Sequence, residues 1–226
     1  MKTAIVTGAS RGLGLALGQA LAVRGWRIVV DARGGAALDE AWAGVPNVTA
    51  VAGNLADVRH RRAIVEAAGP RIDLLVNNAS VLGPSPQPAL ADYPLDELRR
   101  VFEINVVAPL ALVQEALTRL APDARVLNLT SDAAVEPYEG WGGYGSSKAA
   151  LEQLGNVLGV EEPLVRVYTF DPGDMRTQMH QDAFPGVDIS DRPEPETVVP
   201  ALVRIIESKP TSGRYRAGDV AEVVTT

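Results

Sequence analysis

The sequence predicts an α/β fold, a doubly wound and mostly parallel sheet flanked by helices on both faces. Six short apolar runs alternate with longer helix-compatible segments along the 226 residues. The runs are apolar almost throughout, which is typical of parallel strands covered on both sides. No repeat, low-complexity tract or Gly/Ser linker divides the chain. We therefore expect a single domain over residues 1–226.

The elements follow one another in a regular order. Strands are expected at 3–8, 27–32, 48–53, 72–78, 124–131 and 164–171, with the start of a last strand in 212–226. Helix-compatible segments lie at 14–25, 36–44, 57–69, 95–120 and 146–159.

Residues 174–196 break this rhythm. They are polar, contain three prolines and include scattered Met and Phe residues. Such an insertion is either a surface loop or a lid over a ligand, and its length and mixed composition favour the substrate lid.

The composition limits the classes of function. With 46% hydrophobic and 22% charged residues, the chain resembles a soluble globular protein. A net charge of −7 argues against a nucleic-acid partner, and we interpret the basic run 59–62 as a solvated helix face. The absence of cysteine excludes disulfides and thiolate chemistry, and two distant histidines suggest no metal site.

The chain begins directly on a strand-like run, without the features of a signal peptide. No apolar stretch approaches the roughly 20 residues that span a bilayer. We expect a cytoplasmic protein that does not bind membranes.

A glycine-rich turn joins the first strand to the first helix. Gly8, Gly12 and Gly14 would allow a tight turn and a close approach of the backbone to a phosphate at the helix N-terminus. Glycines also make ordinary loops, but their position after a strand and before a helix favours dinucleotide binding.

Tyr144 and Lys148 are four residues apart, where loop glycines give way to a helix-forming run. They would lie on one face of a helix. The pair is either an ordinary surface pair or a functional one, and the rest of the chain has to decide.

Together these motifs identify a family. TGASRGLG (7–14), NNA (77–79), a Ser131 thirteen residues before Tyr144, and PGDMRT (172–177) occur in order. The chain resembles the short-chain dehydrogenase/reductases in their single-domain Rossmann-fold branch. The resemblance covers essentially the whole chain.

The resemblance implies hydride transfer between a nicotinamide cofactor and a carbonyl compound or secondary alcohol. Tyr144 is implied as the general acid or base, and Ser131 as the hydrogen-bond donor to the substrate oxygen. Lys148 would bond the nicotinamide ribose and lower the pKa of the phenol. Asn105 would anchor a water that links Lys148 to solvent.

The resemblance also implies a set of cofactor-binding residues, and charge indicates which cofactor they bind. Arg11 and Arg33 favour the 2′-phosphate of NADP(H), although both could be surface charges and NAD(H) stays possible. Asp31 should point to the other face of the sheet by strand alternation. The full set is Gly8, Ser10, Arg11, Gly12, Leu13, Gly14, Arg33, Asn54, Leu55, Asn78, Ala79, Tyr144, Lys148, Pro172, Gly173 and Thr177.

Candidate substrate contacts flank the active helix and the lid, and most are apolar: Ala133, Tyr138, Trp141, Met175, Met179 and Phe184. They suit a medium-sized, partly hydrophobic carbonyl compound, with Arg176 as a candidate contact for an anionic group. His180 is interpreted as an exposed loop residue. Asp171, directly before the Pro-Gly motif, has no explanation in the sequence.

Two further expectations concern assembly and activity. The helices at 94–120 and 143–158 carry apolar surface for a homodimer or homotetramer, as the resemblance implies. The alternative function is a catalytically silent NADP(H)-binding sensor of the same fold, but such proteins usually lose the tyrosine or the lysine.

Overall fold

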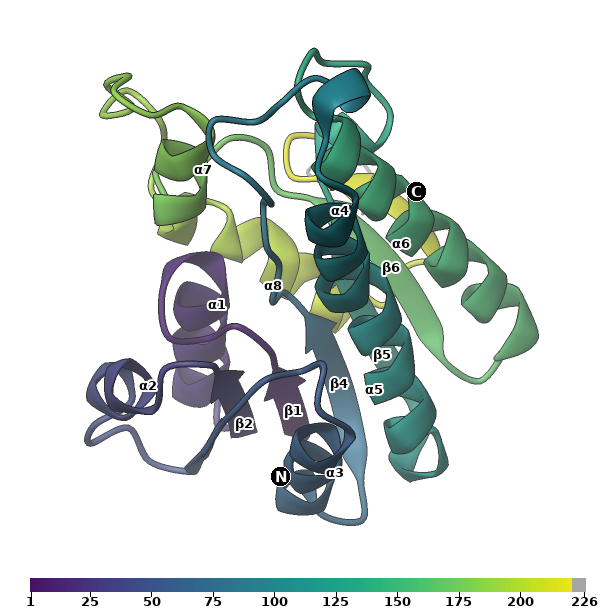
Figure 1. The fold of residues 1–226 in the computed structure, drawn as a ribbon. Helices are drawn as coiled ribbons and strands as arrows, with labels where there is room; N and C mark the ends of the chain where they lie inside the picture. Colours follow the sequence, from purple (N-terminus) through teal and green to yellow (C-terminus); the bar gives the residue numbers. More distant parts are fainter. Residues whose placement is uncertain (221–226) are drawn as a thin grey trace.

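The computed structural model describes residues 1–220 and places seven strands in one parallel sheet. The strand order is β3-β2-β1-β4-β5-β6-β7 (Figure 1). The strands are β1 (Thr3–Val6), β2 (Arg27–Ala32), β3 (Val48–Ala52), β4 (Ile72–Asn77), β5 (Leu120–Leu129), β6 (Arg166–Asp171) and β7 (Gly213–Arg216). The expected doubly wound sheet is confirmed. The part of the expected last strand that falls in 221–226 lies outside the described residues.

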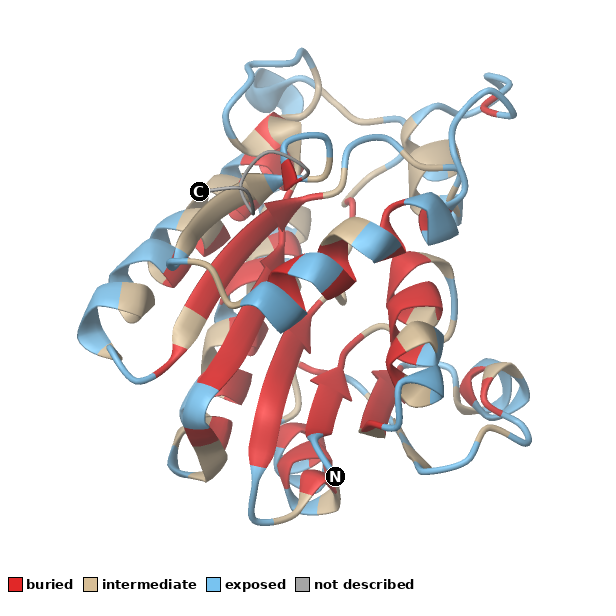
Figure 2. Cartoon of the chain, turned by 180° about the vertical axis from the view of Figure 1, so that it is seen from behind, coloured by how far each residue is buried: buried red, intermediate tan, exposed pale blue. Residues whose placement is uncertain are grey.

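Helices cover both faces of the sheet. They are α1 (Gly12–Val23), α2 (Gly35–Ala41), α3 (Val58–Ala68), α4 (Leu95–Phe102), α5 (Ala108–Ala116), α6 (Gly142–Glu161), α7 (Gln178–Ala183) and α8 (Val199–Ser208). One core cluster joins the sheet to α1 and α8 through residues such as Leu17 and Leu202, and the other joins it to α3 and α5 through Ile64 and Leu112. Figure 2 shows the buried strands between these layers.

The strand order places the candidate site. The chain leaves β1 for β2 on one side and later enters β4 on the other, so the order reverses between β1 and β4. Ligands of open α/β sheets bind outside the carboxyl ends of the strands at such a switch point. The glycine turn, the segment 78–82, Ser131 and the segment 172–177 all follow carboxyl ends at this edge.

The helical stretch Leu95–Arg119 has nearly the expected length but is more apolar than the sequence analysis expected. Its 25 residues meet the length and hydropathy requirements of a membrane span. The apolar face of its α5 part packs in the core through Ala108, Leu112 and Ala116, as in the core helix of an α/β protein. A π-helical turn, Glu103–Val107, joins α4 to α5.

The basic run on α3 was only partly predicted. Arg59 and Arg62 are exposed, but His60 and Arg61 are buried. The Arg61 guanidinium donates to the Leu55 carbonyl at 2.6 Å and to Glu115 at 3.2 Å. The interpretation of 59–62 as a solvated face is therefore wrong for its two middle residues, because tertiary contacts pair them inside the fold.

Candidate active site

The glycine turn has the backbone that phosphate binding requires. Gly8 and Gly12 have φ angles of 65° and 58°, which side-chain-bearing residues rarely adopt. A Cβ on Gly14 would lie 2.4 Å from Asn78 Nδ2, so only glycine lets α1 approach β4 this closely. No side chain caps the N-terminus of α1, which leaves its first amides available to an anion. The turn therefore fits a dinucleotide pyrophosphate.

The segment after β4 is tied to the glycine turn by Thr7, a residue that the sequence analysis did not single out. The Thr7 hydroxyl accepts bonds from the amides of Asn78 and Ala79, both at 3.0 Å, and donates to the Val76 carbonyl. Asn78 Nδ2 donates to the Thr7 and Gly8 carbonyls. These bonds fix the two predicted cofactor segments against each other.

Asp31 is turned into the protein, as strand alternation predicts. One carboxylate oxygen accepts the Gly8 amide at 2.9 Å, and the other lies 3.0 Å from His60 Nε2. Gly53 makes room for this pair, because a Cβ there would lie 2.3 Å from His60 Nδ1. Asp31 therefore holds the glycine turn in place through its bond to the Gly8 amide.

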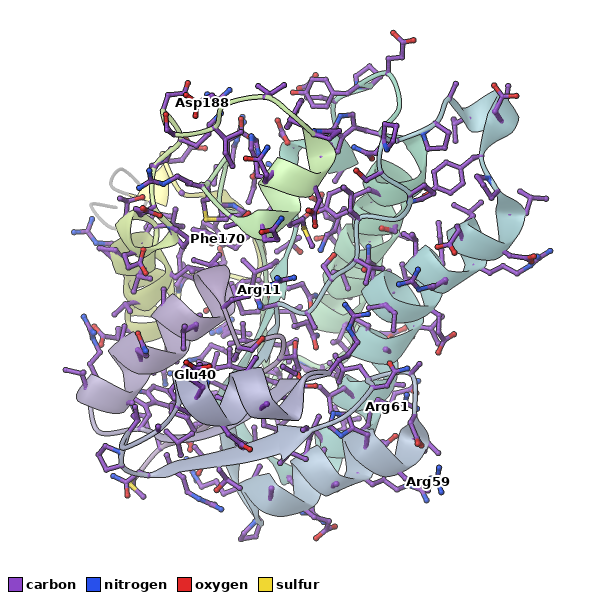
Figure 3. The ribbon with its side chains drawn as sticks, turned by 60° about the vertical axis from the view of Figure 1, so that its left-hand side comes forward. Arg11, Glu40, Arg59, Arg61, Phe170 and Asp188 are labelled. Carbon is purple, nitrogen blue, oxygen red and sulfur yellow. The ribbon has the colours of Figure 1, made fainter. Side chains whose placement is uncertain are left out.

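Two arginines at this edge stay without ionic partners. Arg11 precedes α1 (Figure 3). Arg33 follows β2, and both arginines are exposed. Within residues 1–220, neither has a carboxylate within 4 Å. Asn54 is exposed after β3 and Leu55 is buried beneath it. The two arginines leave positive charge exposed at this edge.

Tyr144 and Lys148 share one face of α6, and both are buried. The Lys148 ammonium lies 5.4 Å from the centre of the Tyr144 ring and donates to the Leu129 carbonyl at 2.9 Å. Burial lowers the pKa of Lys148 to about 8. The helix thus brings the predicted pair together without a direct hydrogen bond between them.

The expected lowering of the Tyr144 pKa is not found in the chain alone. Burial raises the pKa of the phenol above its usual value, and the carboxylates of Asp132 and Asp171 add to this effect. A contribution from the Ser80 hydroxyl acts in the opposite direction but does not reverse it. Tyr144 is therefore a neutral phenol at physiological pH.

Ser131 follows β5 and lies on the same cavity as Tyr144. Its hydroxyl donates to Asp132 Oδ1 at 2.8 Å and accepts the Ala133 amide at 3.2 Å. Gly145 allows α6 to approach this turn, because a Cβ there would lie 2.4 Å from the Ala133 carbonyl oxygen. Glycine at this position is thus part of how the site is built.

Asn105 lies in the π-helical turn and is fully buried. Its side-chain oxygen accepts bonds from Ser80 Oγ and the Val81 amide, and its nitrogen donates to the Val81 carbonyl and Ser147 Oγ. The side chain thus joins the segment after β4 to α6. These bonds occupy the side chain of Asn105. The water that the sequence analysis expected there would therefore have to bind another group.

A cavity of about 410 Å³ opens beside Tyr144. Pro172, Gly173 and Thr177 line it, and Thr177 Cγ2 would lie 3.7 Å from a Cβ on Gly12. Thr177 therefore connects the cavity to the glycine turn. Most of the predicted substrate residues also line the cavity: Tyr138, Trp141, Met175, Met179 and Phe184. Ala133 packs with Tyr144 and Leu82 in a small apolar cluster beside it.

The segment 174–196 is only partly a cover for this cavity. Its first half, including the short helix α7, lines the opening. Asp188 lies at the outer edge of the molecule (Figure 3). Arg176 pairs with Glu194 and does not line the cavity, so it does not serve as an anion contact there.

The cavity also contains residues that the sequence analysis missed or misjudged. His180 is not an exposed loop residue, because α7 places its ring 4.9 Å from the ring of Phe184 with a side chain only 10% exposed. Asp132 and Asp174 also line the cavity. Adjacency to Ser131 and to the Pro-Gly motif is the only sequence signal that could have found these two acids.

Asp171 has an explanation in the structure. It is buried at the end of β6, where one oxygen accepts the Gly173 amide and the other pairs with Arg214 Nη2 at 3.1 Å and Arg216 Nε at 3.5 Å. Arg214 also donates to Glu152 on α6 at 3.1 Å, and weakly to the Ser131 carbonyl at 3.4 Å. One arginine of β7 therefore links the three segments around the cavity.

Comparison with known proteins finds matches over most of the chain. The short chain dehydrogenase family model matches residues 2–188. A sepiapterin reductase of Meriones unguiculatus is 33% identical over 198 residues, 78% of this chain and 75% of that protein.

Solved structures share the fold. A short chain dehydrogenase of Pseudomonas syringae superposes with a TM-score of 0.89 at 30% identity and covers 96% of this chain and 94% of its own. One from Escherichia coli CFT073, complexed with NADPH, has a TM-score of 0.86 at 24% identity and covers 96% of both chains. At that identity the second likeness shows the fold alone.

Proposed function

Because the chain belongs to the short chain dehydrogenase family of oxidoreductases, we propose that it transfers hydride between NADP(H) and a carbonyl or secondary-alcohol carbon. The observation that carries the proposal is one cavity lined by Ser131, Tyr144 and Thr177, the last of which approaches the glycine turn. This arrangement supports a role for the hydroxyls of Ser131 and Tyr144 in binding the substrate oxygen, close to the glycine turn.

The bound nicotinamide would supply the hydride at its C4 atom. The chain's own residues would manage the oxygen and its proton. Tyr144 is a protonated phenol at neutral pH, because burial raises its pKa, and so it can donate a proton to the developing alkoxide. This favours a role as general acid, in the direction of carbonyl reduction.

Ser131 would hold the substrate oxygen beside Tyr144. Its hydroxyl hydrogen bonds Asp132 in the absence of substrate, so it must rotate from this carboxylate to the incoming oxygen. Lys148 keeps further N–H groups beyond the one that bonds Leu129, and these would hold the nicotinamide ribose hydroxyls. These proposed roles require only side-chain adjustments of Ser131 and Lys148.

The preference for NADP(H) is supported by the charges around the adenosine edge. Arg11 and Arg33 have no ionic partners in the described part of the chain, and both oxygens of Asp31 are engaged by Gly8 and His60. Calorimetric titration should show tighter binding of NADPH than of NADH by wild-type protein. The double variant Arg11→Ala, Arg33→Ala should lose this discrimination, and an unchanged ratio of dissociation constants would exclude the proposed role of the arginines.

The catalytic proposal is tested with Tyr144→Phe. NADPH-dependent reduction of a panel of carbonyl compounds should fall by about 10²–10⁴-fold, the usual contribution of a general acid. The dissociation constant of NADPH should change much less than the rate, because Tyr144 is only one of many expected cofactor contacts. Retained turnover in this variant would contradict the assignment of Tyr144.

A further inference from the structure

The cavity contains a second polar group beside the reacting oxygen site, the carboxylate of Asp132. It directly follows Ser131 and lines the cavity. Oδ1 accepts bonds from Ser131 Oγ and the Ala133 amide, each at 2.8 Å. Oδ2 accepts the Tyr138 hydroxyl at 2.9 Å. These neutral donors fix the carboxylate in place, and none of them carries a positive charge that would form an ion pair with it.

The nearby cations are engaged by other acids. Arg214 pairs with Asp171 and Glu152, and Arg216 pairs with Asp171 at 3.5 Å. Asp132 has no basic group within 4 Å in the part of the chain that the structure describes. Burial alone would raise the pKa of Asp132, but the bonds from Ser131, Tyr138 and Ala133, together with the more distant charge of Arg216, outweigh it and leave the pKa lowered. The carboxylate is ionised at neutral pH.

The walls of the cavity are aromatic. Trp141 meets Tyr144 at 5.8 Å, Phe184 at 5.9 Å and Tyr138 at 6.5 Å between ring centres. Among residues 1–220, the lining includes no Lys or Arg. Aromatic faces attract cations and flat apolar groups, and a nearby carboxylate strengthens the attraction for a cation.

The other acid of the cavity contributes less. Asp174 is exposed and lies 3.7 Å from Arg192 Nε and 3.8 Å from His180 Nδ1. Asp174 therefore has a basic partner within 4 Å, whereas Asp132 has none among residues 1–220. Asp132 is also the acid that directly follows Ser131, where the substrate oxygen is expected.

We propose that this cavity selects aromatic carbonyl compounds that carry a protonated nitrogen, with Asp132 as the residue that recognises the cation. The proposal rests on the proposed function, since it places the substrate carbonyl at Ser131 and Tyr144. The aryl group lies against Trp141 and Phe184, and the nitrogen reaches Asp132 Oδ2, which keeps a lone pair beyond the bond from Tyr138. Anionic analogues are excluded by the same charge.

The test uses three acetophenones of similar size with a para substituent of different charge: aminomethyl, hydroxymethyl and carboxylate. NADPH oxidation gives kcat/KM for each ketone. Quenching of tryptophan fluorescence in the presence of NADP⁺ gives the dissociation constant, because Trp141 lines the cavity. We expect kcat/KM and affinity for the aminomethyl compound to exceed those for the carboxylate by about tenfold or more, as expected for a partly desolvated charge pair.

The matched variants separate charge from structure. Asp132→Asn keeps the shape and should reduce the ratio between aminomethyl and carboxylate compounds to about threefold or less. Asp123→Asn removes an exposed carboxylate elsewhere and should leave the ratio unchanged. Asp132→Asn can also slow all three ketones through Ser131, so the ratio and not the absolute rate is the readout.

Equal binding of the three compounds by wild-type protein, or an equal ratio in Asp132→Asn, would overturn the proposal. Binding in the expected order without any turnover would support the selectivity of Asp132 and contradict the proposed function. The two ideas therefore fail in different ways.

Discussion

The ionisation of Lys148 depends strongly on its surroundings. Its ammonium is buried, with one hydrogen bond to the Leu129 carbonyl. Burial lowers its pKa from 10.5 to about 8. Between these two pH values the unfolded chain binds a proton that the folded chain has released, so the free energy of unfolding rises with pH.

This difference predicts a pH-dependent effect of Lys148→Met. As the pH rises from 7 to 9.5, wild type should gain roughly 1–3 kcal/mol of unfolding free energy relative to the variant, since one pKa unit corresponds to about 1.4 kcal/mol. Urea denaturation at both pH values measures the gap. A gap independent of pH would mean that the ammonium is better solvated than its burial indicates.

At the scale of elements, the approach of α6 to the turn after β5 sets the distance between Tyr144 and Ser131. Gly145 is the contact point, since a Cβ added at this position would overlap the Ala133 carbonyl oxygen. Gly145→Ala should therefore push the helix away and lower kcat by about tenfold or more, as expected when catalytic groups are displaced by a fraction of an ångström.

The control for this prediction is Gly159→Ala on the same helix. A Cβ added at this position would lie 3.2 Å from Ser212 Cβ, and neither residue lines the cavity. This variant should keep kcat within about twofold while changing stability by less than about 1 kcal/mol. Equal losses of kcat in the two variants would show that helix packing in general, and not the approach to Ser131, limits the rate.

The contact of β7 with the site segments gives a second prediction at this scale. Asp171→Asn removes the charge of a buried carboxylate that pairs with the partly exposed Arg214 and Arg216. We expect the free energy of unfolding to fall by about 1–3 kcal/mol, the usual contribution of hydrogen bonds to a charged group.

Asp123→Asn is the matched comparison, since it breaks the exposed pair with Lys209. Exposed pairs typically contribute below about 1 kcal/mol. Guanidinium denaturation of both variants decides the question, and losses of equal size would show that Asp171 is not a structural anchor.

At the scale of the whole molecule, exposed apolar side chains suggest assembly. Val107, Val157 and Val160 are exposed on the long helical stretch and on α6. We predict a homodimer or homotetramer through these helices, since apolar patches of this kind mark contact surfaces. Light scattering should give a mass of about twice 23.9 kDa or more, and Val160→Lys should weaken the assembly. A monomer at micromolar concentration would contradict this prediction.

Local signals in the sequence were sufficient for the sheet and the main motifs. The apolar runs mark the parallel strands, and the spacing of Tyr144 and Lys148 places both on one helix face. Strand alternation alone also predicted that Asp31 points to the other face of the sheet, where it contacts His60.

Other features depend on contacts between distant segments, which the sequence does not display. The partners of Asp171 come from β7, more than 40 residues later. The pKa of Tyr144 is governed by burial in the folded chain rather than by the neighbouring lysine. His180 was misjudged because the short helix α7 turns its ring toward Phe184.

Transfer of deuterium from NADPH labelled at both C4 positions tests the central claim most directly. A mixture of carbonyl compounds is incubated with the protein and the labelled cofactor, and the alcohols formed are analysed by mass spectrometry. The account predicts at least one alcohol with a single deuterium on its carbinol carbon from wild type, and at least about a hundredfold less of it from Tyr144→Phe. No labelled alcohol despite bound NADPH, or equal labelling by Tyr144→Phe, would contradict the account.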